Sequence, residues 1–539
     1  QAAVSTSTRL PTPQSETPLD HFSWLGMRHQ CGARWHLVAA LVCAAGFTSA
    51  TLAATEPRGS APLVAVLPGA VPPAKALPFA LGPASAGARN LSADSVSLLL
   101  DGGRWLPTSG EVHYARVPAG QWREELLKMK AGGLDSIAVY AFWIHHEEVE
   151  GKWDFTGRRN IRSFLETAHQ VGLKVLFRIG PWCHGEARNG GHPDWLVQRA
   201  KQKGFRLRQN NSQYMSSVER WYKQVSIQLD GLWWVQGGPI FAVQVDNEMS
   251  DWKYLLALRD LAAASGMNPP VYTKTGWPSP SEGYPNNYPM LPYFGGYMDQ
   301  FWSNDMHEDP DESQYLFGQT RPTPDGYPFL DVEIGGGMEV AYNHRVHMES
   351  EDMPAAHLLK LASGCNGLGY YMYHGGNNPH SSFGDAPEAG LQESSFQPAG
   401  AQNPVPSLSY DFFAPLGEFG QPRRHYHQMR RLHLFVRDFD ALLTSMVPTM
   451  PEIQPKSPKD TTTLRWAVRS DGESGFVFIN NYERLGELPA KTDVRLELQH
   501  RGGRTQFIPH NSSGALTVGS GIWAHWPFNL RMGSITVSH

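Results

Sequence analysis

The sequence contains few charged residues and few cysteines. Only 18% of its 539 residues are Asp, Glu, Lys or Arg, and 46 basic residues nearly balance 51 acidic ones, which leaves a net charge of −5. No long run of like charge is present, and this argues against nucleic acid as a partner and against a polybasic membrane patch. The 4 cysteines form no CxxC pair, so a zinc site built from thiolates is excluded.

The first 54 residues have the pattern of a leader and secretory signal peptide. Residues 1–26 are polar, and Met27 is the more natural start of translation. Basic residues at 28 and 34 precede an apolar run over 35–47, which small residues follow up to Ala54. The run is shorter than the roughly 18 apolar residues that a membrane span needs. We therefore expect an exported protein, periplasmic or extracellular, without membrane association after signal cleavage.

Composition divides the remaining chain into three parts. Residues 55–92 are rich in Ala and Pro and predict an extended segment rather than a packed element. Over 93–438, short apolar or β-branched runs alternate with helical patterns. Residues 439–539 have short alternating runs between Gly, Asn and Asp turns, which predict a small all-β, sandwich-like domain. Cys183 and Cys365 lie near apolar runs of the middle part and are expected to be buried free thiols.

The middle part predicts an α/β fold, a (β/α)8 TIM barrel. Eight strand-like runs with helical crossovers, and no GxGxxG turn after the first of them, favour a closed barrel over an open sheet. The predicted strands are Arg104–Val112, Ser136–Phe142, Lys174–Gly180, Ile240–Asn247, Val271–Trp277, Phe294–Met298, Phe329–Glu333 and Gly367–Tyr373. The predicted helices are Gln121–Ala131, Ile161–Val171, Tyr214–Leu232, Asp251–Ala264 and Asp352–Ser363.

Two carboxylates stand where such a barrel places its catalytic groups, at the carboxyl ends of the strands. Glu248 follows the fourth predicted strand, and Glu333 ends the seventh. A pair of carboxylates across a barrel mouth is what glycoside hydrolysis requires. Asn247, directly before Glu248, can hydrogen-bond a sugar 2-hydroxyl in the transition state. The low charge and the 11% aromatic content also suit neutral ligands such as sugars.

Several strings in this part resemble the β-galactosidases of glycoside hydrolase family 35, in the right order over about residues 95 to 420. They are Ser109–Tyr114, Tyr140–Trp143, Arg178–Pro181 with Glu186, Gly237–Ile240 with Asn247 and Glu248, Tyr371–Gly376, and Ser409–Phe412 with Ala414–Leu416. The resemblance implies a retaining, exo-acting β-galactosidase, here a secreted bacterial one. It assigns Glu248 as acid/base and Glu333 as nucleophile, and it requires no cofactor and no metal.

By motif position, the resemblance also places Tyr140, Glu186, Asn247 and Tyr371 around the sugar. The alternative for Glu186 is an ion pair with Arg188 or Arg178. The chain departs from the family pattern between Pro181 and Glu186, where it has Trp182, Cys183, His184 and Gly185, so the wall of the sugar subsite changes in bulk and polarity. Trp277 falls at the end of the fifth predicted strand, where it could stack on the leaving-group side.

Two further features receive structural interpretations. His145, His146, Glu147 and Glu148 resemble metal ligands but lack HExxH spacing, so no metal site is expected. The basic run over 199–208, which ends at Arg208, is interpreted as a solvated surface of a helix and loop.

The sequence therefore predicts an enzyme that releases terminal β-linked galactose from oligosaccharides or polysaccharides, with galactosyl side chains of plant xyloglucan as one candidate. Two alternatives stay open. The same barrel can cleave another glycon, such as a β-glucosaminide or β-arabinoside, or the chain can be a secreted carbohydrate-binding protein without turnover.

Overall fold

The computed structural model describes residues 61–81, 89–267, 271–274, 285, 287–296, 326–340, 347–380, 391, 406, 408–456, 460–510 and 514–538, with backbone only at 271–274 and 294–296. The predicted leader with Met27, Cys31 and Cys43 lies outside these residues, and so does Trp277.

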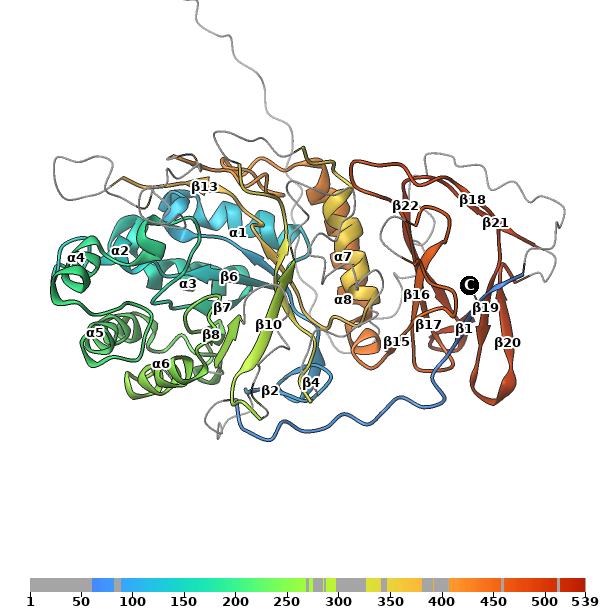
Figure 1. Ribbon diagram of the computed structural model, residues 1–539, viewed down its shortest axis with the longest axis horizontal. Helices are drawn as coiled ribbons and strands as arrows, with labels where there is room; N and C mark the ends of the chain where they lie inside the picture. The colour runs from blue at the N-terminus through green and yellow to red at the C-terminus, as the bar shows by residue number, and fades with distance from the viewer. Residues whose placement is uncertain are drawn as a thin grey trace, which may run out of the picture. The chain divides into compact units, whose positions relative to one another are not determined.

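Eight parallel strands close into a barrel (Figure 1). In chain order they are β5 Thr108–Glu111, β6 Ser136–Tyr140, β7 Lys174–Arg178, β8 Ile240–Gln244, β9 Val271–Lys274, β10 Leu291–Gly296, β11 Asp331–Gly335 and β12 Leu368–Tyr371. The ring closes where β12 pairs with β5, for example Leu368 beside Thr108. Each of the eight strands lies within a few residues of a predicted one.

The described helices are α1 Trp122–Ala131, α2 Trp143–His146, α3 Ile161–Val171, α4 Asp194–Lys203, α5 Ser212–Leu229, α6 Trp252–Ala264, α7 Asp352–Ala362 and α8 Arg424–Leu443. Helix α3 has the predicted bounds because both ends are capped. The side chain of Asn160 accepts a hydrogen bond from the backbone of Ser163, and Gly172 ends the helix at φ 82°. Helices α2, α4 and α8 are not among the predicted ones, and in α8 the apolar positions are interrupted by Arg and His.

The first predicted strand, Arg104–Val112, is two strands in the structure. β4 Gly103–Trp105 belongs to an antiparallel sheet with β2 Leu91–Ala93 and β3 Leu98–Leu100, whereas β5 starts the barrel. Pro107 separates them, and proline cannot donate a ladder hydrogen bond. A short ladder of β13 Gly376–Asn377 and β14 Ser409–Tyr410 lies beyond β12 in the chain.

Residues after α8 form strands in several small sheets. β15 Val447–Thr449, β16 Arg465–Ser470, β17 Gly475–Asn481 and β22 Ile522–Phe528 make the largest. The others are β18 Lys491–Val494 with β21 Leu516–Val518, β19 Leu496–Gln499 with β20 Thr505–Ile508, and β23 Leu530–Met532 with β24 Ile535–Val537. In β16 and β17 every side chain is buried, because Phe476 and Phe478 pack into the barrel's core cluster while Val477 and Ile479 pack into a second one.

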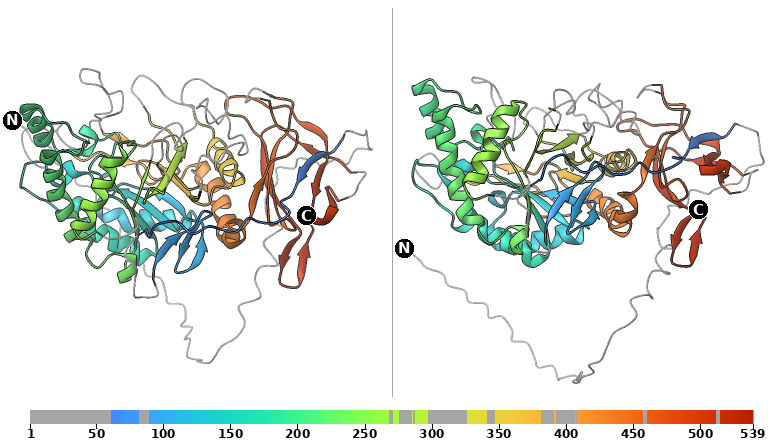
Figure 2. Two further views of the ribbon diagram at one scale, coloured as in Figure 1. Left: turned by 60° about the horizontal axis from the view of Figure 1, so that its bottom comes forward. Right: turned by 90° about the horizontal axis from the view of Figure 1, so that it is seen from below.

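The interpretation of residues 55–92 as an unpacked segment is wrong at β1, Leu63–Val66. This strand pairs in parallel with β19, and Ala65 is fully buried in the core of the C-terminal strands. Figure 2 shows β1 in blue among the red strands. The sequence does not indicate this strand, because β1 is only four residues long and lies in a stretch rich in Ala and Pro. Its buried residue, Ala65, has a small side chain that fits the core.

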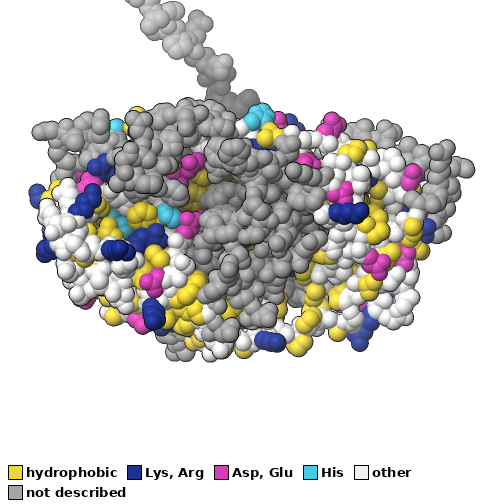
Figure 3. Space-filling view, viewed as in Figure 1, with side chains coloured by type: hydrophobic (Ala, Val, Ile, Leu, Met, Phe, Trp, Pro, Cys, Tyr) yellow, Lys and Arg dark blue, Asp and Glu magenta, His cyan; other side chains and the backbone are white. Residues whose placement is uncertain are grey.

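Arg469 on β16 joins these strands to the barrel. Its buried guanidinium donates to the carbonyls of Leu361, Cys365 and Leu443 and to the side chain of Asn366. Cys183 and Cys365 are buried and free, as predicted. Among the described residues no helix is both long and apolar enough to span a membrane. On the face drawn in Figure 3, described basic and acidic side chains are interspersed.

Candidate active site

The carboxyl ends of the barrel strands bring polar side chains from distant parts of the chain to one place. Glu111 ends β5, Tyr140 ends β6, Arg178 ends β7 and Tyr371 ends β12, while Glu333 lies in β11. Gln244 ends β8, and Asn247 and Glu248 lie three and four residues after it. The parallel register therefore gathers residues that are more than 200 positions apart in the sequence at one mouth.

Arg178 lies at the centre of this group, and its side chain is fully buried. Its guanidinium donates to Glu333, to Gln244, to Glu111 at 2.7 Å and to the Oδ1 atom of Asn247 at 3.0 Å. The contact with Glu333 is also an ion pair. Arg178 thus holds the candidate nucleophile and the candidate sugar-binding amide in one fixed arrangement, since an arginine offers several donors in a rigid plane.

Glu111 shares Arg178 with Glu333, and its side chain is fully buried. Burial raises the pKa of Glu111 to about 7, and the attraction of Arg178 opposes this shift only in part. The other neighbour of Glu111 is His113, 3.3 Å away, and burial lowers the pKa of that histidine well below its usual value. Near neutral pH, Glu111 therefore carries a proton part of the time, while His113 is neutral.

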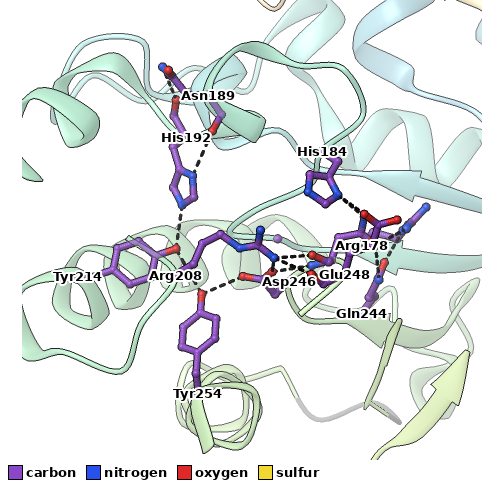
Figure 4. A network of polar contacts seen from close by, with 12 residues as sticks. Arg178, His184, Asn189, His192, Arg208, Tyr214, Gln244, Asp246, Glu248 and Tyr254 are labelled. Atoms are coloured by element: carbon purple, nitrogen blue, oxygen red, sulfur yellow. Dashed lines mark hydrogen bonds and ion pairs between the residues drawn. The ribbon is translucent and has the colours of Figure 1, made fainter. Parts of the chain in front are cut away.

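The segment that carries Glu248 is strained and clamped. Asp246 and Glu248 adopt left-handed backbone conformations with φ of 54° and 48°, which cost roughly 1–3 kcal/mol each outside glycine. Nη2 of Arg208 lies 2.6 Å from Asp246 Oδ1, 2.6 Å from the Asn247 carbonyl and 3.2 Å from the Glu248 carbonyl (Figure 4). The interpretation of Arg208 as part of a solvated surface is therefore wrong.

Asp246 is the buried partner of Arg208. Its carboxylate also accepts hydrogen bonds from the Tyr254 hydroxyl at 2.9 Å and from the backbone N–H of Asn247 at 2.8 Å. Beyond Tyr254 the polar contacts continue to Tyr214 and then to His192, as Figure 4 shows. The acid/base segment is thus anchored to helices α5 and α6, which contribute Tyr214 and Tyr254.

His184 lies directly beside Glu248. Its Nδ1 atom is 2.9 Å from Glu248 Oε2 and 3.1 Å from Asn247 Nδ2. The Trp182 ring meets the His184 ring edge to face, with centroids 5.2 Å apart. The Arg208 guanidinium lies over the Trp182 ring, 4.8 Å from its centroid. Trp182 also packs on Gly190, where an added Cβ would lie 2.4 Å from the indole. The departure from the family pattern at 182–185 therefore touches the candidate acid itself.

Glu186 hydrogen-bonds to tyrosine rather than to an arginine. Its carboxylate accepts a hydrogen bond from Tyr410, whose hydroxyl is 2.7 Å from that of Tyr371. Burial and the nearby carboxyl of Glu339 raise the pKa of Glu186 to about 8. Burial also raises the pKa of Glu339, whose carboxyl is hydrogen-bonded to that of Glu186.

Arg116 fixes the loop that carries Glu186. It donates to the Gly185 carbonyl at 2.6 Å and to Asn378 at 2.7 Å, and its guanidinium lies 3.5 Å from the centre of the Tyr410 ring. The support is needed because His184, Gly185 and Glu186 are all left-handed.

All but one of the predicted site residues lie in connected contacts at one mouth of the barrel: Tyr140, Trp182, His184, Glu186, Asn247, Glu248, Glu333 and Tyr371. The remaining one, Trp277, lies outside the described residues. Tyr140 packs its ring against Arg178 at 3.8 Å, and its buried hydroxyl has no hydrogen-bond partner in the described part of the chain.

Metal ligands do not gather in the described residues: no three His, Cys, Asp or Glu side chains there could hold an ion. His146 instead contacts the Tyr114 hydroxyl and the Asp154 carbonyl, while Glu147 pairs with Arg220. These two motif residues therefore have structural partners.

From the sequence alone, Glu111, Arg116 and Tyr410 receive no individual role, Arg178 is only an alternative ion-pair partner of Glu186, and Arg208 is placed on a solvated surface. Glu111 and Arg178 end barrel strands, so the rule that found Glu333 could also have found them. Arg116 and Tyr410 lie outside the barrel strands, and Arg208 lies in a basic run from which no local pattern distinguishes it.

Comparison with known proteins agrees with this geometry. Residues 97–436 match the family described as glycosyl hydrolases family 35. The chain belongs to this family. Similar proteins include beta-galactosidase 6 of Oryza sativa subsp. japonica, 28% identical over 67% of this chain and 38% of that protein, and the beta-galactosidase of Felis catus, 29% identical over 71% and 54%.

The chain spans about half the length, or less, of these relatives. A solved beta-galactosidase from the psychrophilic Marinomonas ef1 is 12% identical, covers 63% of this chain and 61% of its own, and aligns with a TM-score of 0.45. A likeness of that degree carries no argument about this chain.

Proposed function

We propose that this family 35 member is a retaining, exo-acting β-galactosidase. The observation that carries the proposal is the joining of two carboxylates from opposite parts of the barrel through three residues. Glu333 is bound by Arg178, Arg178 binds Asn247, and Asn247 contacts the histidine that holds Glu248. The galactose preference is supported by the beta-galactosidase names of the relatives.

In this proposal the two carboxylates divide the chemistry. Glu333, 3% exposed and paired with Arg178, is the nucleophile that bonds to the anomeric carbon. Glu248, whose side chain is 19% exposed, protonates the leaving oxygen and then removes a proton from the attacking water. Asn247 binds the 2-hydroxyl, and Tyr140, Glu186 and Tyr371 bind the other hydroxyls of the ring. No cofactor enters these steps.

The test uses p-nitrophenyl β-D-galactoside with the wild type, Glu333→Gln and Glu248→Gln. The wild type should release galactose, and the β anomer should appear first by proton NMR. Glu333→Gln should lose at least about 1,000-fold in kcat, because the nucleophile is gone. Absence of release by the wild type, or undiminished release by Glu333→Gln, would refute the proposal.

A second glycon is favoured by one observation, the carboxyl pair of Glu186 and Glu339 at the sugar subsite. Two adjacent carboxyls suit an ammonium group, as in a β-glucosaminide. A panel of p-nitrophenyl β-galactoside, β-glucosaminide and β-arabinoside decides between them by kcat/KM. Tight binding without turnover across the panel would favour a carbohydrate-binding protein. Oligosaccharides from xyloglucan extend the panel to natural side chains.

We also propose export, supported by the signal-like pattern from Met27 to Ala54. Expression of the chain from Met27 in a bacterial host, followed by N-terminal sequencing of the protein recovered outside the cytoplasm, tests it. A cytoplasmic protein with an uncleaved leader would contradict it.

A further inference from the structure

The contact between His184 and Glu248 leaves one question open, namely which of the two carries the proton. An Nδ1 atom 2.9 Å from a carboxylate oxygen fits two arrangements. In the first, His184 is protonated and donates to an ionised Glu248. In the second, Glu248 is a carboxylic acid that donates to the lone pair of a neutral His184. Only the second arrangement keeps Glu248 ready to act as an acid.

The surrounding hydrogen bonds decide this, because Arg178 can only donate. Its Nε donates to Gln244, which identifies the atom that it meets as the Gln244 oxygen. The other end of that amide, Nε2, then donates to Asn247 Oδ1 at 3.0 Å, as Arg178 Nη2 does at 3.0 Å. Two donors therefore fix Oδ1 of Asn247, and its Nδ2 must point to His184.

The chain of donors ends at Nδ1 of His184, which receives Asn247 Nδ2 at 3.1 Å. An Nδ1 that accepts a hydrogen bond carries no proton, so neutral His184 has its proton on Nε2. The 2.9 Å contact with Glu248 then needs a proton on Glu248 Oε2, because two acceptors would otherwise face each other. The single Nδ1 lone pair is shared by both donors.

We propose that His184 is a positioning residue that holds Glu248 in its protonated form, as the acid of the reaction. This inference rests on the proposed function of Glu248. In the first step the proton passes from Oε2 to the glycosidic oxygen while the bond from that oxygen to the anomeric carbon breaks and Glu333 bonds to that carbon. In the second step water bonds to that carbon while the bond from the carbon to Glu333 breaks, and the water gives a proton to Glu248, which again donates to His184.

Other charged groups face this pair from several elements. Arg208 contacts the Glu248 carbonyl and pairs with Asp246, and Arg178 with Glu333 lies behind Asn247. The carboxyl of Glu186, two residues further along the loop, interacts electrostatically with His184. Substitutions at His184 leave all of these in place, so a matched pair of variants isolates the role of Nδ1.

The matched variants are His184→Gln and His184→Met. Both side chains are unbranched and of similar size, and both bear the same cost of the left-handed backbone at φ 52°. The Gln oxygen can still accept hydrogen bonds from Asn247 and Glu248, whereas the Met side chain cannot. The assay is the pH profile of kcat/KM for phenyl β-D-galactoside, whose poor leaving group needs an acid.

His184→Met should move the alkaline limb of this profile about 0.5–1 pH unit lower, the value of one hydrogen bond to the protonated form. His184→Gln should move it by less than half as much. With 2,4-dinitrophenyl β-D-galactoside, which leaves without protonation, the limb should not move. Two results with the phenyl substrate overturn the proposal. If the alkaline limb of His184→Met moves to higher pH, His184 and Glu248 form an ion pair. If the limb does not move, His184 has only a structural role.

A second measurement does not depend on turnover. Long-range 1H–15N spectra of protein labelled at histidine, with His184 assigned from its absence in His184→Gln, report which ring nitrogen is protonated. We expect the Nε2–H tautomer, and the Nδ1–H tautomer would overturn the proposal. If the wild type hydrolyses no β-galactoside, the proposed function fails, and this spectrum alone decides the inference about His184.

Discussion

Removal of Arg208 should separate the stability of the acid/base segment from its catalytic geometry. The perturbation is Arg208→Met, made both in the wild type and in Asp246→Asn. Methionine keeps much of the aliphatic volume beside Trp182 but removes the charge and every donor. Asp246→Asn removes the charge that Arg208 balances, so the two backgrounds distinguish loss of a salt bridge from loss of the clamp on the backbone.

The expected magnitudes follow from burial. Asp246 is fully buried, so removing Arg208 alone leaves an uncompensated charge that costs about 3 kcal/mol of unfolding free energy, the low end for a broken buried pair. The lower value applies because Tyr254 and the Asn247 amide still donate to Asp246. In the Asp246→Asn background the same change should cost only about 1 kcal/mol, a coupling of about 2 kcal/mol.

Catalysis should respond differently. In both backgrounds Arg208→Met releases the carbonyls of Asn247 and Glu248, and the left-handed residues relax. Loss of about 1.5–3 kcal/mol of hydrogen bonding in the transition state corresponds to roughly 10–100-fold in kcat. KM should change little, because Arg178 and Gln244 still hold the Asn247 side chain and Arg208 contacts only its backbone carbonyl.

Urea unfolding measures the stabilities, and hydrolysis of p-nitrophenyl β-D-galactoside measures kcat and KM. Two results would refute the reasoning. In the first, Arg208→Met in the Asp246→Asn background retains full kcat, so the clamp does not position Glu248. In the second, Arg208→Met costs the same stability in both backgrounds, so Asp246 is not its electrostatic partner.

Three further predictions concern other contacts. Burial raises the pKa of Glu111 to about 7, so the folded state binds its proton more tightly than the unfolded state. The unfolding free energy that this proton contributes should be lost as pH rises from about 5 to 7. Glu111→Gln should flatten the dependence of unfolding free energy on pH, measured by urea unfolding, and an unchanged dependence would contradict the assignment. Tyr410→Phe removes the donor to Glu186 and should raise KM about tenfold with a smaller change in kcat, whereas an unchanged KM would show that Glu186 needs no such support. Ala65→Asp buries an unpaired charge in the core of the C-terminal strands and should lower the midpoint of thermal unfolding by several degrees. Val66→Asp is the control, because Val66 is 52% exposed and the same change there should not lower the midpoint. Equal effects of the two substitutions would mean that β1 is not packed as the structure shows.

The alternation of apolar strands and helical patterns was enough to predict the barrel. Strands such as β6 and β8 are five-residue, mostly apolar runs that are buried on both faces. The capping residues of α3 fixed its ends. The pattern failed where tertiary contacts decide, as at β1, whose pairing with β19 depends on a segment more than 400 residues away.

In the candidate site, too, residues that follow from strand order could be predicted, and residues that depend on tertiary contacts could not. The rule that catalytic groups follow barrel strands predicted Glu248 and Glu333, because it depends only on strand order. It could not predict that Arg208 reaches Asp246, since an arginine in a basic run has the same local sequence whether it is solvated or buried. Nor could it predict that His184 contacts Glu248, because that contact depends on the left-handed turn at 184–186.

Strain and support are coupled throughout this mouth. His184, Glu186, Asp246 and Glu248 are all left-handed, and each such residue costs roughly 1–3 kcal/mol. Two buried or half-buried arginines offset that cost by binding the carbonyls of these turns, Arg116 at Gly185 and Arg208 at Asn247 and Glu248. A carboxylate at a strand end is therefore only part of the chemistry. The arginines that hold its backbone set where it can reach, so their loss should impair catalysis without touching a reacting atom.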